Sequence, residues 1–290
     1  MSVNLMLSRR DLGKLALSSA AAALGSAARI DSTFGGVRVG VQTYSFRDRP
    51  LDEAIAAMRT IGFGYAELSA RHVQPGDPAA EREWRTAAPL EDFRRVRRTF
   101  DDAGIVLYAY TYNIREDFTD DEIEYGFKMA RSLGVSRLNS SAKVSSAARV
   151  DRFAQAYKIQ AGMHNHASMA PNEFSTPADF KKAMEGRSRY LCMNLDIGHF
   201  TAAGFDPVSF LEENHHRITT LHVKDRKRNR DGEQGENVPL GQGDTPVKEV
   251  LRLMKRKKYP IPAMIEYEYR GADTIVEVRR CLDYIKDVLA

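Results

Sequence analysis

The feature that most constrains the fold is an alternation of two hydrophobic patterns along the chain. Short apolar or β-branched runs, typical of buried strands, alternate with longer stretches whose apolar residues recur every three or four positions, as on one face of a helix. Strands are predicted at 37–45, 65–69, 105–112, 135–141, 159–166, 190–198, 218–225 and 261–269. Helical patterns lie between them, for example at 51–62, 90–104, 120–134, 177–186, 246–258 and 272–289.

Eight such units over about 260 residues predict an α/β protein that folds as a single-domain (β/α)₈ TIM barrel. An open, doubly wound sheet is the competing fold, but no predicted strand is followed by a G-x-G-x-x-G turn or a phosphate-binding loop. The charged stretch 224–237 is expected to form a long loop after a strand. Of the two cysteines, Cys192 lies in an apolar run, which favours buried free thiols over a disulfide with Cys281.

The first 28 residues differ in character from the rest of the chain. Arg9 and Arg10 precede an alanine-rich apolar run from Leu15 to Leu24, and small residues follow. This order is typical of a twin-arginine export signal, and the run is too short to remain as a membrane span. The predicted segments are an export signal at 1–28, a linker at 29–36 and the barrel at 37–290. We therefore expect a periplasmic protein without a stable membrane anchor.

The net charge argues against a nucleic-acid partner. The chain carries +4, and its first 28 residues hold three basic residues and one acidic residue, so the remainder carries only +2. A nearly neutral surface does not attract a polyanion strongly.

Residues of the types that commonly serve as metal ligands lie at the ends of the last four predicted barrel strands. In a barrel, the carboxyl ends of parallel strands meet at one mouth. The residues are His164 and His166 at the fifth strand, Asp196 and His199 at the sixth, His222 at the seventh, and Glu266 and Glu268 at the eighth. Each alone has an ordinary structural explanation, such as a hydrogen-bonded histidine or a turn-forming aspartate. Together they favour a binding site for a divalent ion such as Mn²⁺, Co²⁺, Zn²⁺ or Mg²⁺.

Strand periodicity predicts which of these side chains point the same way. Residues two positions apart in a strand share a face. The expected pairs are His164 with His166, His222 with Lys224, and Glu266 with Glu268.

Several short motifs carry a family resemblance. They are "GVQTYSFRD" at 40–48, "YAELS" at 65–69, "HNH" at 164–166, "DIGH" at 196–199, "LHVKD" at 221–225, "PLGQGDTP" at 239–246 and "IEYE" at 265–268. Together they resemble the xylose isomerase-like TIM-barrel family of sugar phosphate isomerases and epimerases, from about residue 37 to the end. The resemblance implies a sugar or keto-sugar as substrate, and a homodimer as one assembly open to the chain.

The resemblance also implies roles for individual residues. In that family one residue from each of the last four strands holds the metal, and the corresponding residues here are His164, Asp196, His222 and Glu266. The implied catalytic residues are Glu266, Lys224 and His199. The implied substrate contacts are Glu67, His166, Arg226, Tyr44 and Glu268.

One position departs from the family pattern and changes the expected mechanism. Two-base epimerases of the family carry a carboxylate at the fifth strand, where this chain has His164. A metal-bound neutral imidazole has no free lone pair to accept a proton, so Glu266 is left as the single predicted base. One base suffices for a metal-dependent isomerase or epimerase-type enzyme that removes a proton next to a sugar carbonyl. The alternative is a lyase or hydrolase that cleaves 3-keto-glycosides, or dehydrates an inosose-like substrate, by β-elimination.

The residues disfavour two further classes of protein. Endonucleases acting at abasic DNA sites resemble this fold, but they need a three-metal cluster with more histidine and glutamate ligands than this chain supplies. A non-catalytic periplasmic sugar-binding protein would need hydrogen-bonding and aromatic groups rather than four metal-ligand positions.

Overall fold

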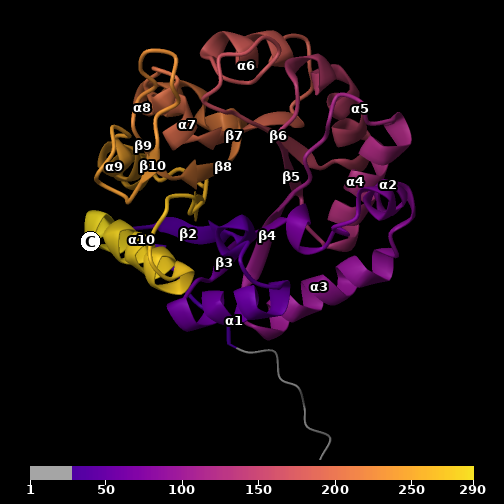
Figure 1. Ribbon diagram of the computed structural model, residues 1–290, viewed down its shortest axis with the longest axis horizontal. Coiled ribbons are helices and arrows are strands. Elements are labelled where there is room, and N and C mark those ends of the chain that lie inside the picture. The colour runs from indigo at the N-terminus through magenta and orange to yellow at the C-terminus, as the bar shows by residue number, and fades with distance from the viewer. Residues whose placement is uncertain (1–27) are drawn as a thin grey trace, which may run out of the picture.

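Eight parallel strands close into a barrel in the computed structural model, which describes residues 28–290 (Figure 1). They are β2 (Val37–Gln42), β3 (Tyr65–Ser69), β4 (Val106–Thr111), β5 (Arg137–Ser140), β6 (Gln160–His164), β7 (Leu191–Asp196), β8 (Ile218–Val223) and β11 (Ala263–Ile265). Because β2 pairs in parallel with both β3 and β11, the sheet has no open edge among these strands. The predicted (β/α)₈ barrel is confirmed. Apart from Ala28, the predicted export signal lies outside the described residues.

Helices form a ring around the strands (Figure 1). They are α1 (Leu51–Ile61), α2 (Pro78–Ala87), α3 (Leu90–Asp102), α4 (Asp120–Ser132), α5 (Ala147–Tyr157), α6 (Pro177–Met184), α7 (Ile197–Ala202), α8 (Pro207–Asn214), α9 (Val247–Lys257) and α10 (Thr274–Leu289). Local chemistry sets several of their ends. A capping box of Thr119 and Glu122 starts α4, and Gly62 ends α1 with φ +102°, a left-handed conformation that favours glycine. Among residues 28–290, no helix is both long and apolar enough to cross a membrane.

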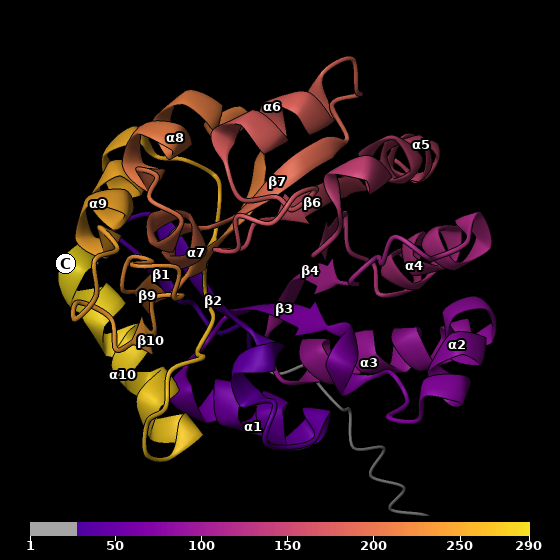
Figure 2. The ribbon, with the colours of Figure 1, turned by 45° about the horizontal axis from the view of Figure 1, so that its top comes forward.

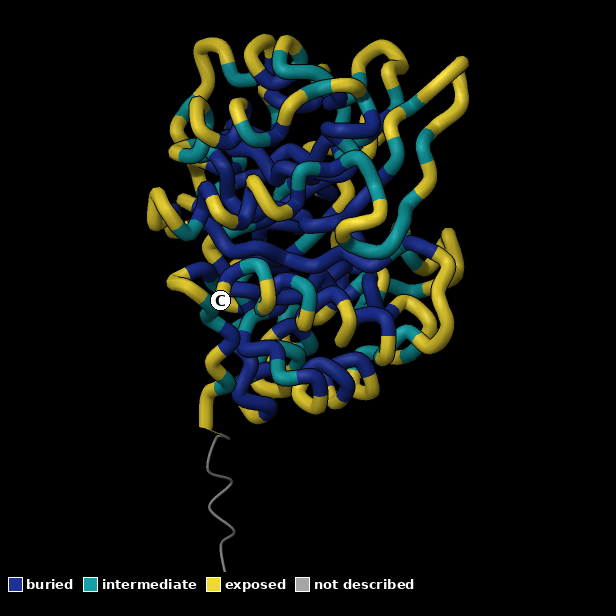
Figure 3. The backbone as a smooth tube through the Cα atoms, turned by 90° about the vertical axis from the view of Figure 1, so that its left-hand side faces the viewer, coloured by how far each residue is buried: buried dark blue, intermediate teal, exposed yellow. Residues whose placement is uncertain are grey.

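The core consists of the strands and the helix faces turned toward them (Figure 3). All six residues of β7 and all six of β8 are buried, as expected for strands covered on both sides. Cys192 and Cys281 are buried and free, which confirms the prediction of free thiols.

The stretch 224–237 contains more structure than the loop expected from its charge. Two short strands, β9 (Asp225–Arg226) and β10 (Asn237–Val238), pair antiparallel, and they lie beside α7 (Figure 2). The Asp225 carboxylate accepts hydrogen bonds from the backbone N–H groups of Gly241, Gly243 and Thr245. This aspartate of the "LHVKD" motif therefore folds the "PLGQGDTP" segment rather than facing the barrel mouth.

Candidate active site

Four residues that the sequence places at neighbouring strand ends meet at the barrel mouth. Strand register sets Asp196 opposite His222, while His164 ends β6 and Glu266 directly follows β11. One donor atom from each of these four buried residues lies within 4.8 Å of the other three. Two imidazoles and two carboxylates are a donor set that suits a divalent metal ion. In addition, Asp196 Oδ2 accepts no hydrogen bond from residues 28–290. The residues therefore fit the predicted metal, and their role as ligands stays a prediction.

Lys224 places a fixed positive charge beside this cluster. Its Nζ lies 3.0 Å from Asp196 Oδ2, in an ion pair without hydrogen-bond geometry, 2.7 Å from Glu266 Oε2 and 2.5 Å from Glu268 Oε2. Burial lowers the pKa of the Lys224 ammonium, but the three carboxylates outweigh it and hold the pKa above its ordinary value. A Cβ at Gly198 would lie 2.4 Å from Lys224 Cγ, so only glycine leaves room for this side chain.

His222 lies between two carboxylates. Its Nδ1 is 3.1 Å from Glu266 Oε2, and its Nε2 is 3.1 Å from Glu67 Oε1. Burial lowers the pKa of His222, yet Glu67 and Glu266 together raise it well above its ordinary value. Burial raises the pKa of the Glu266 carboxyl, but Lys224 and His222 outweigh it and hold that pKa well below its usual range. Glu266 is therefore ionised at neutral pH.

Glu67 lies deeper than the sequence suggested. Its side chain is fully buried behind His222, and it is not among the residues that line the cavity. Its Oε1 also accepts a hydrogen bond from Thr111 Oγ1 at 2.5 Å. Glu67 thus contacts His222, a candidate metal ligand, and its predicted substrate contact stays a prediction. Position at a strand end does not reveal how far a side chain lies below the barrel mouth.

The remaining histidines of the site are neutral. Burial, assisted by His222, lowers the pKa of His164 to about 4, and burial, assisted by His164, lowers that of His166 to about 4. Burial and then Lys224 hold the pKa of His199 well below its ordinary value. The three rings lie together, with centroids 4.9 Å apart for His164 and His166 and 5.4 Å apart for His166 and His199. His164 and His166 both line the cavity, as their spacing in the strand predicts.

Arg226 also lies behind another residue. Its guanidinium donates to His199 Nδ1 and to the carbonyl oxygen of Gly235, and its side chain does not line the cavity. Arg226 therefore contacts His199, and its predicted substrate contact stays a prediction. Because arginine can only donate, His199 Nδ1 accepts from it, while Nε2 lies 3.4 Å from the Lys224 ammonium, which also can only donate. His199 itself lines the cavity.

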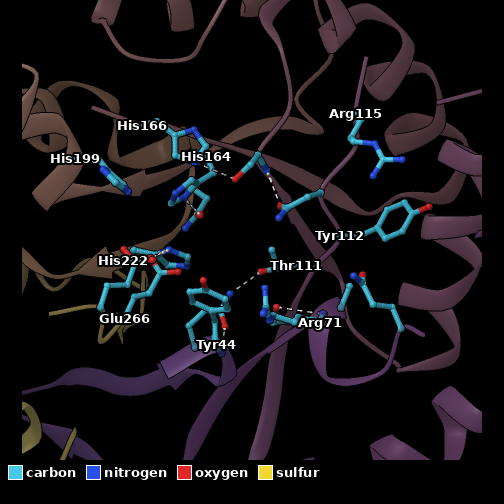
Figure 4. A pocket seen from close by; sticks show the side chains of 18 of the residues that line it. Tyr44, Arg71, Thr111, Tyr112, Arg115, His164, His166, His199, His222 and Glu266 are labelled. Carbon is cyan, nitrogen blue, oxygen red and sulfur yellow. Dashed lines mark hydrogen bonds and ion pairs between the residues drawn. The ribbon is translucent and has the colours of Figure 1, made fainter. Parts of the chain in front are cut away.

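A cavity of about 520 Å³ opens above the cluster. The histidines and Glu266 lie on one side of it, and Arg71, Tyr112 and Arg115 lie on the other (Figure 4). Tyr44 and Glu268 line it too, as expected. The sequence motifs did not single out Arg71, Tyr112 and Arg115. The available signal was their place at or just after the ends of the predicted strands at 65–69 and 105–112, which open into the same mouth.

Comparison with known proteins places this geometry in a family. No curated protein matches the chain. Three similar solved structures are a sugar phosphate isomerase/epimerase from Parabacteroides distasonis (16% identity, TM-score 0.62), the IolI protein with a bound zinc atom (15%, 0.67) and an L-ribulose 3-epimerase (16%, 0.66). The matches cover 89%, 87% and 87% of this chain and 98%, 98% and 94% of those chains, respectively, and at these identities they show the fold. The family model for the xylose isomerase-like TIM barrel matches residues 55–287, so the chain belongs to that family.

Proposed function

We propose that this protein is a divalent-metal-dependent enzyme that removes a proton next to the carbonyl of a sugar or keto-sugar, as an isomerase or epimerase-type catalyst. The observation that carries the proposal is the buried group of His164, Asp196, His222 and Glu266, with Lys224 and His199 beside it at the inner side of a cavity. The names of the similar structures, an L-ribulose 3-epimerase and a sugar phosphate isomerase/epimerase, support this class of reaction.

The metal-ligand residues would be His164, Asp196, His222 and Glu266, holding one Mn²⁺, Co²⁺, Zn²⁺ or Mg²⁺ ion. A bound divalent ion supplies Lewis-acid polarisation of the carbonyl. The IolI structure with its zinc atom supports a metal in this fold.

The chain's own groups account for proton transfer and substrate orientation. Glu266 is ionised and lines the cavity, so it can accept the proton from the carbon next to the carbonyl. Returning that proton to the carbonyl carbon, while the proton of the adjacent hydroxyl group passes to the carbonyl oxygen, completes an aldose–ketose isomerisation. The ring of His199 and the ammonium of Lys224 lie at the same side of the cavity, and they can hold the substrate oxygens that gain negative charge.

The structure offers no carboxylate at the fifth barrel strand to act as a second base. His164 stands there with a pKa of about 4, and its Nδ1 is 2.7 Å from Asn194 Oδ1. Symmetric exchange between two carboxylates is therefore disfavoured, and a reaction that uses Glu266 alone is favoured.

A second candidate is β-elimination from a 3-keto-glycoside or an inosose-like substrate. The observation that favours it is a proton donor close to the base, because Lys224 Nζ lies 2.7 Å from Glu266 Oε2. Glu266 would take the proton, the C–O bond β to the carbonyl would break with its electron pair on oxygen, and Lys224 would protonate that oxygen. The cavity continues past the cluster toward Arg71 and Arg115, which gives space for a leaving group.

Proton exchange in deuterated water distinguishes these reactions. The metal-loaded protein is incubated with free ketoses and with 3-keto-glycosides, and NMR follows each carbon. Isomerisation predicts deuterium at a carbon next to the carbonyl of the ketose together with the aldose product. Elimination predicts loss of the glycosidic group from the 3-keto-glycoside. Absence of exchange and product with both substrate classes, in protein shown to hold metal, would refute the proposal.

Export to the periplasm and a homodimeric assembly remain proposals that rest on the sequence. Replacing Arg9 and Arg10 by lysine should retain the protein in the cytoplasm, which cell fractionation measures. Sedimentation of the purified protein tests the homodimer.

A further inference from the structure

A layer of buried polar side chains lies directly beneath the candidate metal cluster. Barrel interiors are usually filled by branched apolar side chains. Here five polar residues, each at most 2% exposed, take part instead: Glu67, Asn139, Asn194, Thr219 and Thr220. Four of them form a connected network, because Asn139 and Asn194 both donate to Thr220 Oγ1, at 2.8 and 2.7 Å, and Thr219 Oγ1 donates to Asn139 Oδ1 at 2.9 Å.

Gly162 on β6 leaves the space that this layer occupies. A Cβ at that position would lie 2.3 Å from Asn139 Oδ1, 2.5 Å from Thr219 Oγ1 and 3.2 Å from Asn194 Cβ. Any side chain would collide with the network. The layer is therefore a built feature of the interior and not a chance contact of polar groups.

At one end of the layer, Glu67 orients His222. Its Oε1 lies 3.1 Å from His222 Nε2, while Nδ1 of the same ring faces Glu266, a member of the cluster. Thr111 Oγ1 donates to the same Glu67 oxygen and fixes the carboxylate in place. A carboxylate oxygen that faces a ring nitrogen at 3.1 Å accepts its proton, so Glu67 favours a proton on Nε2 and leaves Nδ1 for the cluster.

At the other end, Asn194 orients His164 in the opposite sense. The Asn194 amide N–H group donates to Thr220 Oγ1, so its Oδ1 faces His164 Nδ1, at 2.7 Å. That oxygen can only accept, so it requires a proton on Nδ1 and leaves Nε2 of His164 for the cluster.

We propose that Glu67 and Asn194 are positioning residues that fix opposite tautomers of the two histidine ligands, so that His222 binds the metal through Nδ1 and His164 through Nε2. This inference rests on the proposed metal site. Partners of this kind orient a ligand ring and raise its donor strength, and their loss typically weakens metal binding about 10- to 100-fold. Glu67 also contributes a negative charge, which Asn194 does not.

Zinc affinity provides the first test, measured by competition with a chromogenic chelator. Glu67→Gln keeps the shape of the side chain and removes its charge, and we expect it to weaken zinc binding about 10- to 100-fold. Asn194→Leu removes the acceptor and should also weaken binding, while Asn194→Asp keeps an acceptor oxygen and should retain it. The matched control is Glu53→Gln, which removes the same charge from an exposed position on α1 and should bind zinc like the wild type.

A spectroscopic readout separates positioning from a merely structural role. Long-range ¹H–¹⁵N correlation on the zinc-loaded protein reports which ring nitrogen carries the proton. We expect Nε2–H at His222 and Nδ1–H at His164, and the opposite pattern at either ring would overturn the assignment.

The outcomes distinguish this inference from the proposed function. If the wild type binds no divalent metal, both fail. If the wild type binds zinc and Glu67→Gln binds it equally well, with the tautomer of His222 unchanged, only the positioning inference fails.

Discussion

At the scale of single residues, Glu266 is expected to serve both as ligand and as base. It is 8% exposed, touches His222 and Lys224, and lines the cavity. Replacing Glu266 by glutamine keeps an oxygen for the metal but removes the ability to accept a proton. We expect kcat to fall by about 100-fold or more while zinc binding is largely kept. Steady-state kinetics beside zinc titration measure this, and unchanged kcat in the metal-loaded variant would remove Glu266 from the mechanism.

The sequence predicted the direction of these side chains better than their depth. Two-residue spacing correctly turned His164 and His166 into the cavity, and likewise Glu266 and Glu268, while Tyr267 and Tyr269 pack against each other, with centroids 4.6 Å apart. Spacing gives the face of a strand but not what lies in front of it, so it did not reveal that Glu67 lies behind His222 and Arg226 behind His199. The contact of Arg226 with His199 depends on how the segment 225–238 folds back, which no local pattern encodes.

At the scale of elements, a buried ion pair joins α2 to α4. Arg85 Nε lies 2.8 Å from Glu122 Oε1, and the Arg85 side chain is only 3% exposed. Replacing Glu122 by glutamine leaves the guanidinium with Glu81 as its remaining carboxylate partner. We expect a loss of about 2 kcal/mol in the free energy of unfolding, measured by urea denaturation near neutral pH.

This ion pair also predicts a pH dependence. Burial raises the pKa of Glu122, but the Thr119 backbone and Arg85 outweigh it, so the pKa is lowered from 4.5. The unfolded state therefore binds the proton more readily, and the stabilisation is present above the unfolded pKa and lost as pH falls through the folded one. The difference in stability between wild type and Glu122→Gln should shrink below about pH 4. A difference that stays constant down to acid pH would contradict this.

Strand β6 offers a second test at this scale. Gly162→Ala would push a methyl group into Asn139 and Thr219, at a cost of about 1–3 kcal/mol in unfolding free energy. Gly76→Ala is the matched control, because nothing lies within 4 Å of its Cβ position. Equal stability of the two variants would show that the polar network rearranges at little cost in free energy to accept the methyl group.

Strong hydrophobic periodicity made most helices and strands predictable from the sequence. Several other helices and the shortest strands were not predicted. The helices α2, α5, α7 and α8 were not identified individually; α7 spans only Ile197–Ala202, and α8 only Pro207–Asn214. The pairing of β9 with β10 was missed because two-residue strands have no period to detect. Such elements form through tertiary contacts, as with the hydrogen bonds that Asp225 accepts.

At the scale of the whole molecule, barrel closure gives the cavity two different sides. The candidate metal ligands come from the second half of the barrel, and Arg71 and Arg115 follow β3 and β4 in the first half (Figure 4). Arg71 also lies 5.7 Å from the Tyr44 ring centroid. Arg71 lies across the cavity from the base, so we expect it to bind the substrate equally in the ground state and the transition state. Arg71→Ala should therefore raise KM roughly several-fold and leave kcat nearly unchanged. A fall in kcat at constant KM would assign Arg71 to the chemical step.

In the proposed function, closure of the barrel assembles one divalent metal site from four strand ends distant in sequence. Elemental analysis of the purified protein, after incubation with Mn²⁺, Co²⁺, Zn²⁺ or Mg²⁺ and removal of excess ion, tests it most directly. We predict one tightly held ion per chain in the wild type and a clear loss in His164→Ala, with the fold retained by circular dichroism. Only trace metal in the wild type, or equal metal in wild type and His164→Ala, would contradict this four-residue metal site.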